Sequence, residues 1–300
     1  MFRVLENLYN LVIVTRNGFL NRQEAQCEAF KLIEKRRRNT MGRENMLAYT
    51  RVGKKESEVT LVFIHGSTML KEAMLPLADK LQEYDCISFD MTAHGESEGE
   101  EPEEVAVFAE DVEFSIEQLW KKNEISKKII LLGYSMGGAI TCEIAIRKKI
   151  ETAGIVILSS GGNLKDYTPL VDDLKAMPVE QFRTEDILGG LFGSDTPEAD
   201  VEKITKQFAT LKVDDAIGYG DLMASNRYEN LEACREIMVP TLLIHGNDDK
   251  IVLPMAAVET WKRIANSELL MIPYKGHAAI YEDMDLVTEK IRSFVKTCSL

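Results

Sequence analysis

The chain has 300 residues, of which 45% are hydrophobic and 28% charged, which is typical of a globular protein and excludes a disordered or collagen-like chain. A net charge of −13 repels phosphate backbones, so no nucleic-acid partner is expected. Five cysteines without a CxxC spacing indicate reduced thiols in the cytoplasm and exclude a disulfide framework or a zinc ribbon.

The start of the chain differs from the rest in charge. Residues 1–55 carry 12 Lys or Arg and 5 Asp or Glu, whereas the remainder carries 24 and 44. Asn21 and Glu24 resemble a capping box at the start of a helix. We expect residues 1–45 to be a helical extension of one or two helices packed on the body. The alternatives are a helix in residues 1–40 that contacts a membrane surface or docks on a partner, which is less favoured, and a frayed tail.

Short apolar runs alternate with helix-length segments from Val59 onward. Buried strands that alternate with helices predict an α/β fold, with a mostly parallel sheet and helices on both faces. In such sheets the functional groups lie beyond the carboxyl ends of the strands. The predicted strands are Val59–Ile64, Cys86–Asp90, Lys128–Leu132, Gly154–Leu158, Thr241–His245 and Leu269–Ile272. The predicted helices lie near residues 70–83, 103–121, 136–149, 254–265 and 283–297.

Residues 163–235 interrupt this alternation. They contain no strong strand pattern, and prolines and glycines divide them into several helical pieces. A stretch of this length is too long for a plain loop in a compact domain. We therefore expect a core made of residues 46–162 and 236–300, with an inserted helical lid at 163–235. The alternative is an ordinary pair of crossover helices with long loops.

The strongest motif is Gly133-Tyr134-Ser135-Met136-Gly137. It follows an apolar strand and opens a predicted helix, and a GxSxG pattern in that position places the serine on a sharp turn. Such a turn strains the serine by about 1–3 kcal/mol and needs small residues on either side. The adjacent helix N-terminus directs its dipole at the reacting atom. The motif predicts Ser135 as a nucleophile, and the alternative is a structural serine in a glycine-rich turn.

A serine hydroxyl is a weak nucleophile, so it needs a base and an acid that orients the base. His277 follows the last predicted strand and is the best of the four histidines for the role of base. His65 and His245 are expected to hydrogen-bond to backbone at strand ends, and His94 to brace a loop. The acid follows the strand that ends at His245, where the residues leave two choices open, Asp248 and Asp249.

Attack of a serine hydroxyl on a carbonyl group turns the carbonyl oxygen into an oxyanion, which requires two hydrogen-bond donors. We expect these to be the backbone N–H groups of Met136, directly after the nucleophile, and of Ser67, after the first apolar strand. Losing one such donor typically costs about 3 kcal/mol of transition-state stabilisation.

These motifs together resemble the α/β-hydrolase superfamily, in order and in spacing, over about residues 59–297. The resemblance implies an α/β-hydrolase fold, and it points to Asp249 as the acid because the family places it three residues after the strand-end glycine. Residues 163–235 are similar to the lids of carboxylesterases and monoacylglycerol lipases. The matching motifs are His65-Gly66-Ser67, Asp90 with His94–Ser97, Gly133–Gly138, His245-Gly246 with Asp249, and Gly276-His277.

The resemblance implies a serine hydrolase that cleaves carboxylic esters of small or acyl-chain substrates through an acyl-enzyme on Ser135, without a metal or cofactor. Two alternatives stay open: hydrolysis of a thioester, amide or C–C bond by the same residues, and a hydrolase-fold ligand-binding protein with little turnover. A serine at 135 excludes the relatives with an Asp nucleophile. Ala139 stands where the similar menaquinone-pathway synthases carry Arg, which disfavours a lyase.

Overall fold

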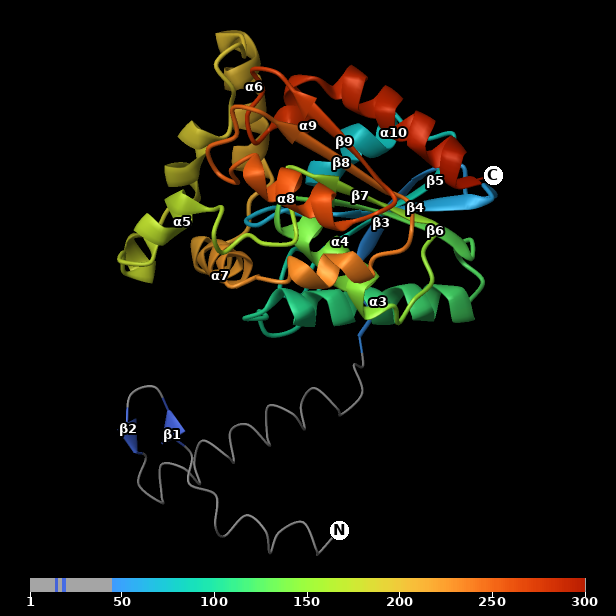
Figure 1. The fold of residues 1–300 in the computed structure, drawn as a ribbon, viewed down its shortest axis with the longest axis horizontal. Coiled ribbons are helices and arrows are strands. Elements are labelled where there is room, and N and C mark those ends of the chain that lie inside the picture. Colours follow the sequence, from blue (N-terminus) through green and yellow to red (C-terminus); the bar gives the residue numbers. More distant parts are fainter. Residues whose placement is uncertain (1–13, 16–17, 20–44, 300) are drawn as a thin grey trace, which may run out of the picture. The chain divides into compact units, whose positions relative to one another are not determined.

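The computed structural model describes residues 14–15, 18–19 and 45–299. A seven-stranded sheet forms the centre of the larger unit, which begins at Met46 (Figure 1). All neighbouring strands are parallel except the edge strand β3, which is antiparallel to β5. In spatial order the strands are β3 (Tyr49–Gly53), β5 (Asp85–Phe89), β4 (Val59–Ile64), β6 (Lys128–Tyr134), β7 (Gly154–Leu158), β8 (Thr241–Gly246) and β9 (Ser267–Ile272).

The six predicted strands are therefore present, with ends within about two residues of the predicted positions. Strands β4, β5, β7 and β8 are buried along their whole length, which explains why they read as continuous apolar runs. The sequence did not predict β3. Its residues are half-buried at the sheet edge and mix polar with apolar side chains, so they lack that signal.

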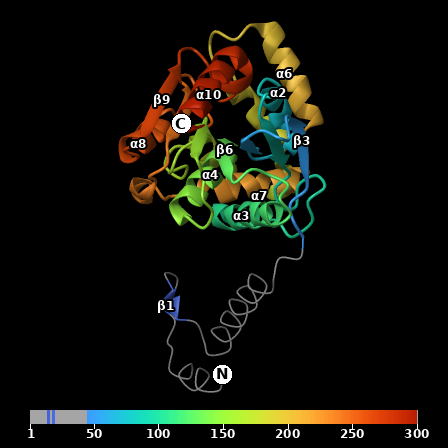
Figure 2. The ribbon, with the colours of Figure 1, turned by 90° about the vertical axis from the view of Figure 1, so that its right-hand side faces the viewer.

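Helices cover both faces of the sheet, as predicted. Figure 2 shows α3 and α4 on one side and α2 and α10 on the other. Helix α8 packs against β8 and β9, and the short α9 precedes α10. The bounds are α2 (Leu75–Asp79, after the 3₁₀ turn η2, Lys71–Met74), α3 (Val105–Lys121), α4 (Met136–Arg147), α8 (Met255–Arg263), α9 (Ala279–Glu282) and α10 (Met284–Ser299).

Residues 163–235, here called the helical insertion, leave the core after β7 and return before β8. Its helices α5, α6 and α7 gather at one end of the sheet in Figure 1. The helical content agrees with expectation, while the role of a lid stays a prediction. Its elements are α5 (Pro169–Leu174), η3 (Val179–Gln181), η4 (Thr184–Gly190), α6 (Glu198–Thr210), α7 (Asp215–Asn226) and η5 (Glu232–Glu236).

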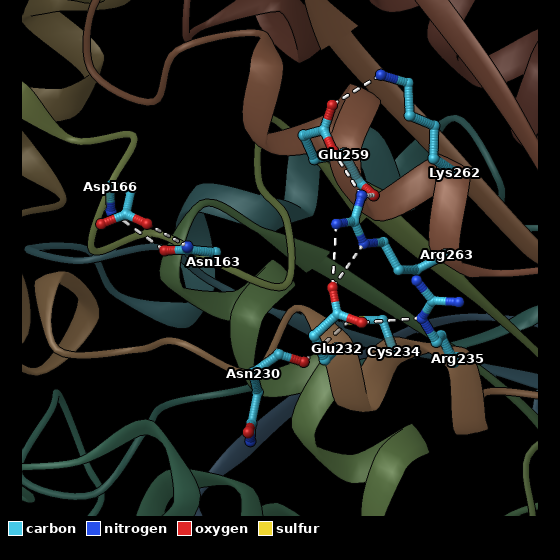
Figure 3. A network of polar contacts seen from close by, with 9 residues as sticks. All are labelled: Asn163, Asp166, Asn230, Glu232, Cys234, Arg235, Glu259, Lys262 and Arg263. Carbon is cyan, nitrogen blue, oxygen red and sulfur yellow. Dashed lines mark hydrogen bonds and ion pairs between the residues drawn. The ribbon is translucent and has the colours of Figure 1, made fainter.

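The two ends of the helical insertion lie side by side. The Leu164 N–H donates to the Tyr228 carbonyl at 3.0 Å, and Asn163 forms a β-bridge with Glu229. Figure 3 shows the polar contacts near both ends. Glu232 of η5 accepts hydrogen bonds from Arg235 (2.9 Å) and from Arg263 of α8 (3.0 Å), so the returning chain is tied to the core.

The first unit of the chain, Met1–Asn45, is described at few positions. Strands β1 (Val14–Thr15) and β2 (Gly18–Phe19) pair antiparallel, an element that the sequence analysis did not anticipate. The expected helices of residues 1–45, with their capping box at Asn21 and Glu24, otherwise lie outside the described residues. Within the described ranges, no helix is long and apolar enough to cross a membrane.

Candidate active site

Ser135 lies on the sharp turn that the GxSxG motif predicts, between β6 and α4. Its backbone has φ 54° and ψ −119°, a conformation that residues other than glycine rarely adopt. The two flanking glycines make this turn possible. A Cβ on Gly133 would lie 2.0 Å from the carbonyl oxygen of Gly137, and a Cβ on Gly137 would lie 2.2 Å from that of Ile64. Helix α4 therefore lies closer to β6 and β4 than a side chain at Gly133 or Gly137 would allow.

This close approach predicts a clear effect for Gly137→Ala. The added methyl group collides with backbone of β4, so α4 must move away from the sheet and take Ser135 with it. We expect a loss of about 1–3 kcal/mol in the free energy of unfolding, measured by urea denaturation. Gly189→Ala is a control, since a Cβ there meets nothing within 4 Å. Equal stability of the two variants would contradict the packing described here.

The three side chains predicted to act together do meet in space. His277 Nε2 lies 3.0 Å from Ser135 Oγ, and His277 Nδ1 lies 2.8 Å from Asp249 Oδ2. The three residues follow β6, β8 and β9, so they share the carboxyl edge of the sheet. The structure also separates the two candidate acids, because Asp249 is buried, whereas Asp248 is half-buried and accepts the Ser194 N–H instead.

Asp249 is held as a carboxylate by four contacts. Its Oδ1 accepts the backbone N–H groups of Ile251 and Val252, both at 2.9 Å. Its Oδ2 faces His277 and also His245 Nε2 at 3.0 Å. Burial alone would raise the pKa of Asp249, but the charge of His277 and the imidazole hydrogen bonds outweigh burial and hold the pKa well below its ordinary value. The acid therefore stays ionised throughout the range in which a histidine titrates.

His245 was expected to bond only to backbone, and this interpretation is incomplete. Its Nε2 lies 2.9 Å from the Val252 carbonyl, as expected, but it also contacts Asp249. Two further hydroxyl groups support the base. Tyr134 Oη and Ser159 Oγ donate to the carbonyl of His277 at 3.2 and 2.8 Å. The sequence carried no signal for the contacts of these two hydroxyl groups, because each joins residues more than a hundred positions apart.

The expected oxyanion donors flank Ser135, the predicted nucleophile. Met136 is the first residue of α4, so no carbonyl one turn earlier in the helix accepts its N–H. The loop that carries Ser67 is adjacent, since a Cβ on Gly66 would lie 3.0 Å from Ser135 Cβ. Among the described residues, no acceptor takes the Ser67 N–H. Both donors are therefore available for a developing negative charge.

A cavity opens at Ser135. Its floor is formed by Ser67, Ser135 and His277, and its walls come largely from the helical insertion. The walls are mostly apolar, while Lys212 and Glu185 form an ion pair at 2.7 Å. The apolar wall residues are Met69, Ile187, Leu188, Leu191, Phe208, Ala209, Leu222 and Ile251.

The remaining two histidines lie behind the loop that carries Ser67. His65 donates from Nδ1 to the Gly66 carbonyl (2.9 Å) and accepts the Met91 N–H (3.1 Å), as expected for a backbone-bonded residue. Burial, and then the charge of His94, lower the pKa of His65 to about 4. His94 braces its loop as predicted. Burial opposes its protonation, but Asp221 of α7 outweighs this and raises the pKa of His94 to about 9.

A sequence profile described as serine aminopeptidase, S33 (Hydrolase_4), matches residues 55–284. The chain belongs to this family of α/β hydrolases. The α/β hydrolase is 28% identical over 262 residues to the AB hydrolase superfamily protein YisY of Bacillus subtilis. The matched region covers 78% of this chain and 90% of YisY. The chain is 22% identical over 263 residues to Lipase 1 of Psychrobacter immobilis, with coverage of 85% and 82%.

Solved structures agree with the sequence comparisons. A lipase-esterase related protein from Clostridium acetobutylicum superposes on this α/β hydrolase with a TM-score of 0.74 and 30% sequence identity. The superposition covers 83% of this chain and all of that one. The predicted superfamily and the predicted fold are thereby confirmed.

Proposed function

We propose that this α/β hydrolase is a serine carboxylesterase that cleaves esters of small or acyl-chain substrates through an acyl-enzyme. The observation that carries the proposal is the continuous hydrogen-bonded chain from Asp249 through His277 to Ser135, with distances of 2.8 and 3.0 Å. A nucleophile, a base and an orienting acid in this order form the arrangement that acyl transfer requires.

In the first half of the reaction, Ser135 Oγ attacks the ester carbonyl while His277 Nε2 accepts its proton. Asp249 stabilises the imidazolium that forms and fixes the proton on Nδ1. The N–H groups of Ser67 and Met136 bind the oxyanion. His277 then protonates the leaving alcohol. In the second half, His277 activates a water molecule that hydrolyses the acyl-enzyme and frees Ser135.

The cavity wall favours an acyl group over a peptide with a free amino terminus. An aminopeptidase needs an unpaired carboxylate to bind the substrate's ammonium group. Among the described residues that line the cavity, the one with a carboxylate is Glu185, and its ion pair with Lys212 already neutralises that charge. The apolar side chains of the helical insertion instead suit a hydrocarbon chain. We further propose that the helical insertion acts as the lid over this site.

A substrate panel tests the proposal. We expect p-nitrophenyl acetate, butyrate and octanoate to be hydrolysed, and the matched anilides and an aminoacyl anilide to react at least about 100-fold more slowly in kcat/KM. A thioester and a C–C bond substrate extend the panel to the other reaction classes. Faster cleavage of the aminoacyl anilide than of any ester would contradict an esterase, whatever residue acts as nucleophile.

A further inference from the structure

The loop that carries Ser67 is held by the helical insertion as well as by the core. Thr68 donates its N–H to Asp221 Oδ2 at 2.8 Å, and its carbonyl accepts the Val213 N–H at 3.1 Å. The Ser67 hydroxyl lies 3.1 Å from that of Ser225. Asp221 and Ser225 both belong to α7. Two consecutive residues of the loop are thus fixed by a segment about 150 positions later in the chain.

The backbone of this loop needs such support. Thr68 has φ 68°, and a β-branched residue rarely adopts the left-handed region. A conformation of this kind persists only where neighbouring groups hold it, and it costs on the order of 1–3 kcal/mol. The N–H that Thr68 donates to Asp221 lies in the peptide unit between Ser67 and Thr68, and the Ser67 N–H lies in the preceding unit, which is joined to it through the Cα atom of Ser67. Relaxation of Thr68 would therefore redirect the donor that faces the oxyanion.

Asp221 is fully buried in the middle of α7, where a carboxylate is costly unless it is paired. Its Oδ2 accepts the Thr68 N–H and also the Nε2–H of His94 at 2.9 Å. Its Oδ1 has no hydrogen-bond partner among the described residues. Burial, and then the charge of Asp221, raise the pKa of the nearby Glu101 to about 7, which lessens the repulsion between the two acids below that pH. The paired oxygen of Asp221 thus bonds only outside its own helix.

We propose that Asp221 is a positioning residue for catalysis: it holds the turn at Thr68, and with it the Ser67 N–H, at the place where the oxyanion forms. Helix α7 then supplies a supporting residue to the active site and also lines its cavity. This inference rests on the proposed acyl-transfer function, because it assigns a supporting group to that reaction.

The test compares Asp221→Ala and Asp221→Asn with the unmodified protein. Removing the carboxylate releases Thr68, so Asp221→Ala is expected to lower kcat for p-nitrophenyl butyrate by about 10- to 100-fold with KM within about twofold. The amide oxygen of Asn still accepts from Thr68, so Asp221→Asn is expected to keep most of kcat. Asn226→Ala is the matched control, since this buried polar residue of α7 bonds to Thr168 and Asp172 instead.

A second readout follows the rate at which a fluorophosphonate labels Ser135. Its phosphonyl oxygen occupies the oxyanion position, so the labelling rate should fall in parallel with kcat in Asp221→Ala. If that variant does not fold, Ser225→Ala decides, with an expected loss in both rates of about threefold or more. Unchanged rates in a folded Asp221→Ala, or in Ser225→Ala where it decides, would overturn the proposal. An equal loss of rates in Asn226→Ala would also overturn it.

The two readouts separate this inference from the proposed function. If the unmodified protein hydrolyses no ester but its Ser135 is labelled, the proposed function fails and the labelling rates still test Asp221. If Ser135 is not labelled at all, both ideas fail together. If hydrolysis depends on Ser135 but not on Asp221, the proposed function stands and this inference alone is wrong.

Discussion

Replacement of Ser135 by alanine is expected to lower ester hydrolysis by about 10⁴- to 10⁶-fold while the fold stays intact. The substitution removes only the Oγ atom that His277 contacts at 3.0 Å. The strained backbone is unaffected, because alanine has the same φ preference and the Ser135 N–H still donates to the Leu158 carbonyl at 2.9 Å. We therefore expect the melting temperature to change by no more than about 2 °C.

The measurement is the initial rate with p-nitrophenyl butyrate, together with calorimetry of the same preparation. Ser293→Ala, which changes an exposed serine of α10, controls for contaminating esterases and for handling. Residual turnover above about one per cent of the unmodified protein would show that Ser135 is not the nucleophile.

Asp249→Asn is expected to lower kcat by about 10⁴-fold with the geometry largely preserved. An amide in this place presents an N–H₂ group to His277 or His245, both of which need an acceptor there. His277 then loses the tautomer that leaves Nε2 free to accept the serine proton. Asp248→Asn is the matched control, because that half-buried neighbour bonds to Ser194 and not to a histidine. A loss in Asp248→Asn as large as in Asp249→Asn would contradict the assignment of the acid.

The same variant has a predicted pH signature. The pKa of Asp249 is lower in the folded chain than in the unfolded chain, so this carboxylate stabilises the fold above its unfolded pKa of about 4. That contribution falls as the pH drops toward the folded pKa. The melting temperature of Asp249→Asn should therefore lie furthest below that of the unmodified protein near neutral pH, with a smaller difference near pH 3. A difference that grows on acidification would show that the sign of the shift is wrong.

Patterns that are local in the sequence predicted most of the fold and pointed to side chains that the structure brings together at the candidate site. Buried parallel strands read as apolar runs, so β4 to β8 could be found without knowing their neighbours. Ser135 was found because its turn needs small residues at fixed positions. Asp249 needed the family resemblance, since two adjacent acids are equivalent until the fold buries one of them against His277 and turns the other toward Ser194.

The rest depends on contacts between distant segments. Strand β3 is half-buried at the sheet edge and lacks a continuous apolar run. Tyr134 and Ser159 contact the His277 carbonyl only because β6, β7 and the loop after β9 meet at one edge of the sheet. Asp221 looks like one polar residue of an amphipathic helix, and its role as a partner of Thr68 and His94 arises only when α7 packs on the core. No periodicity or motif encodes such pairs.

Trapping of the acyl-enzyme tests the central claim most directly. The protein is mixed with p-nitrophenyl butyrate, quenched in acid within the first turnovers, digested and analysed by mass spectrometry. The account predicts one butyryl group, on the peptide that contains Ser135, and a slower appearance of this adduct in Asp249→Asn. A butyryl group on a different residue, or steady turnover in which the Ser135 peptide never carries one, would contradict it.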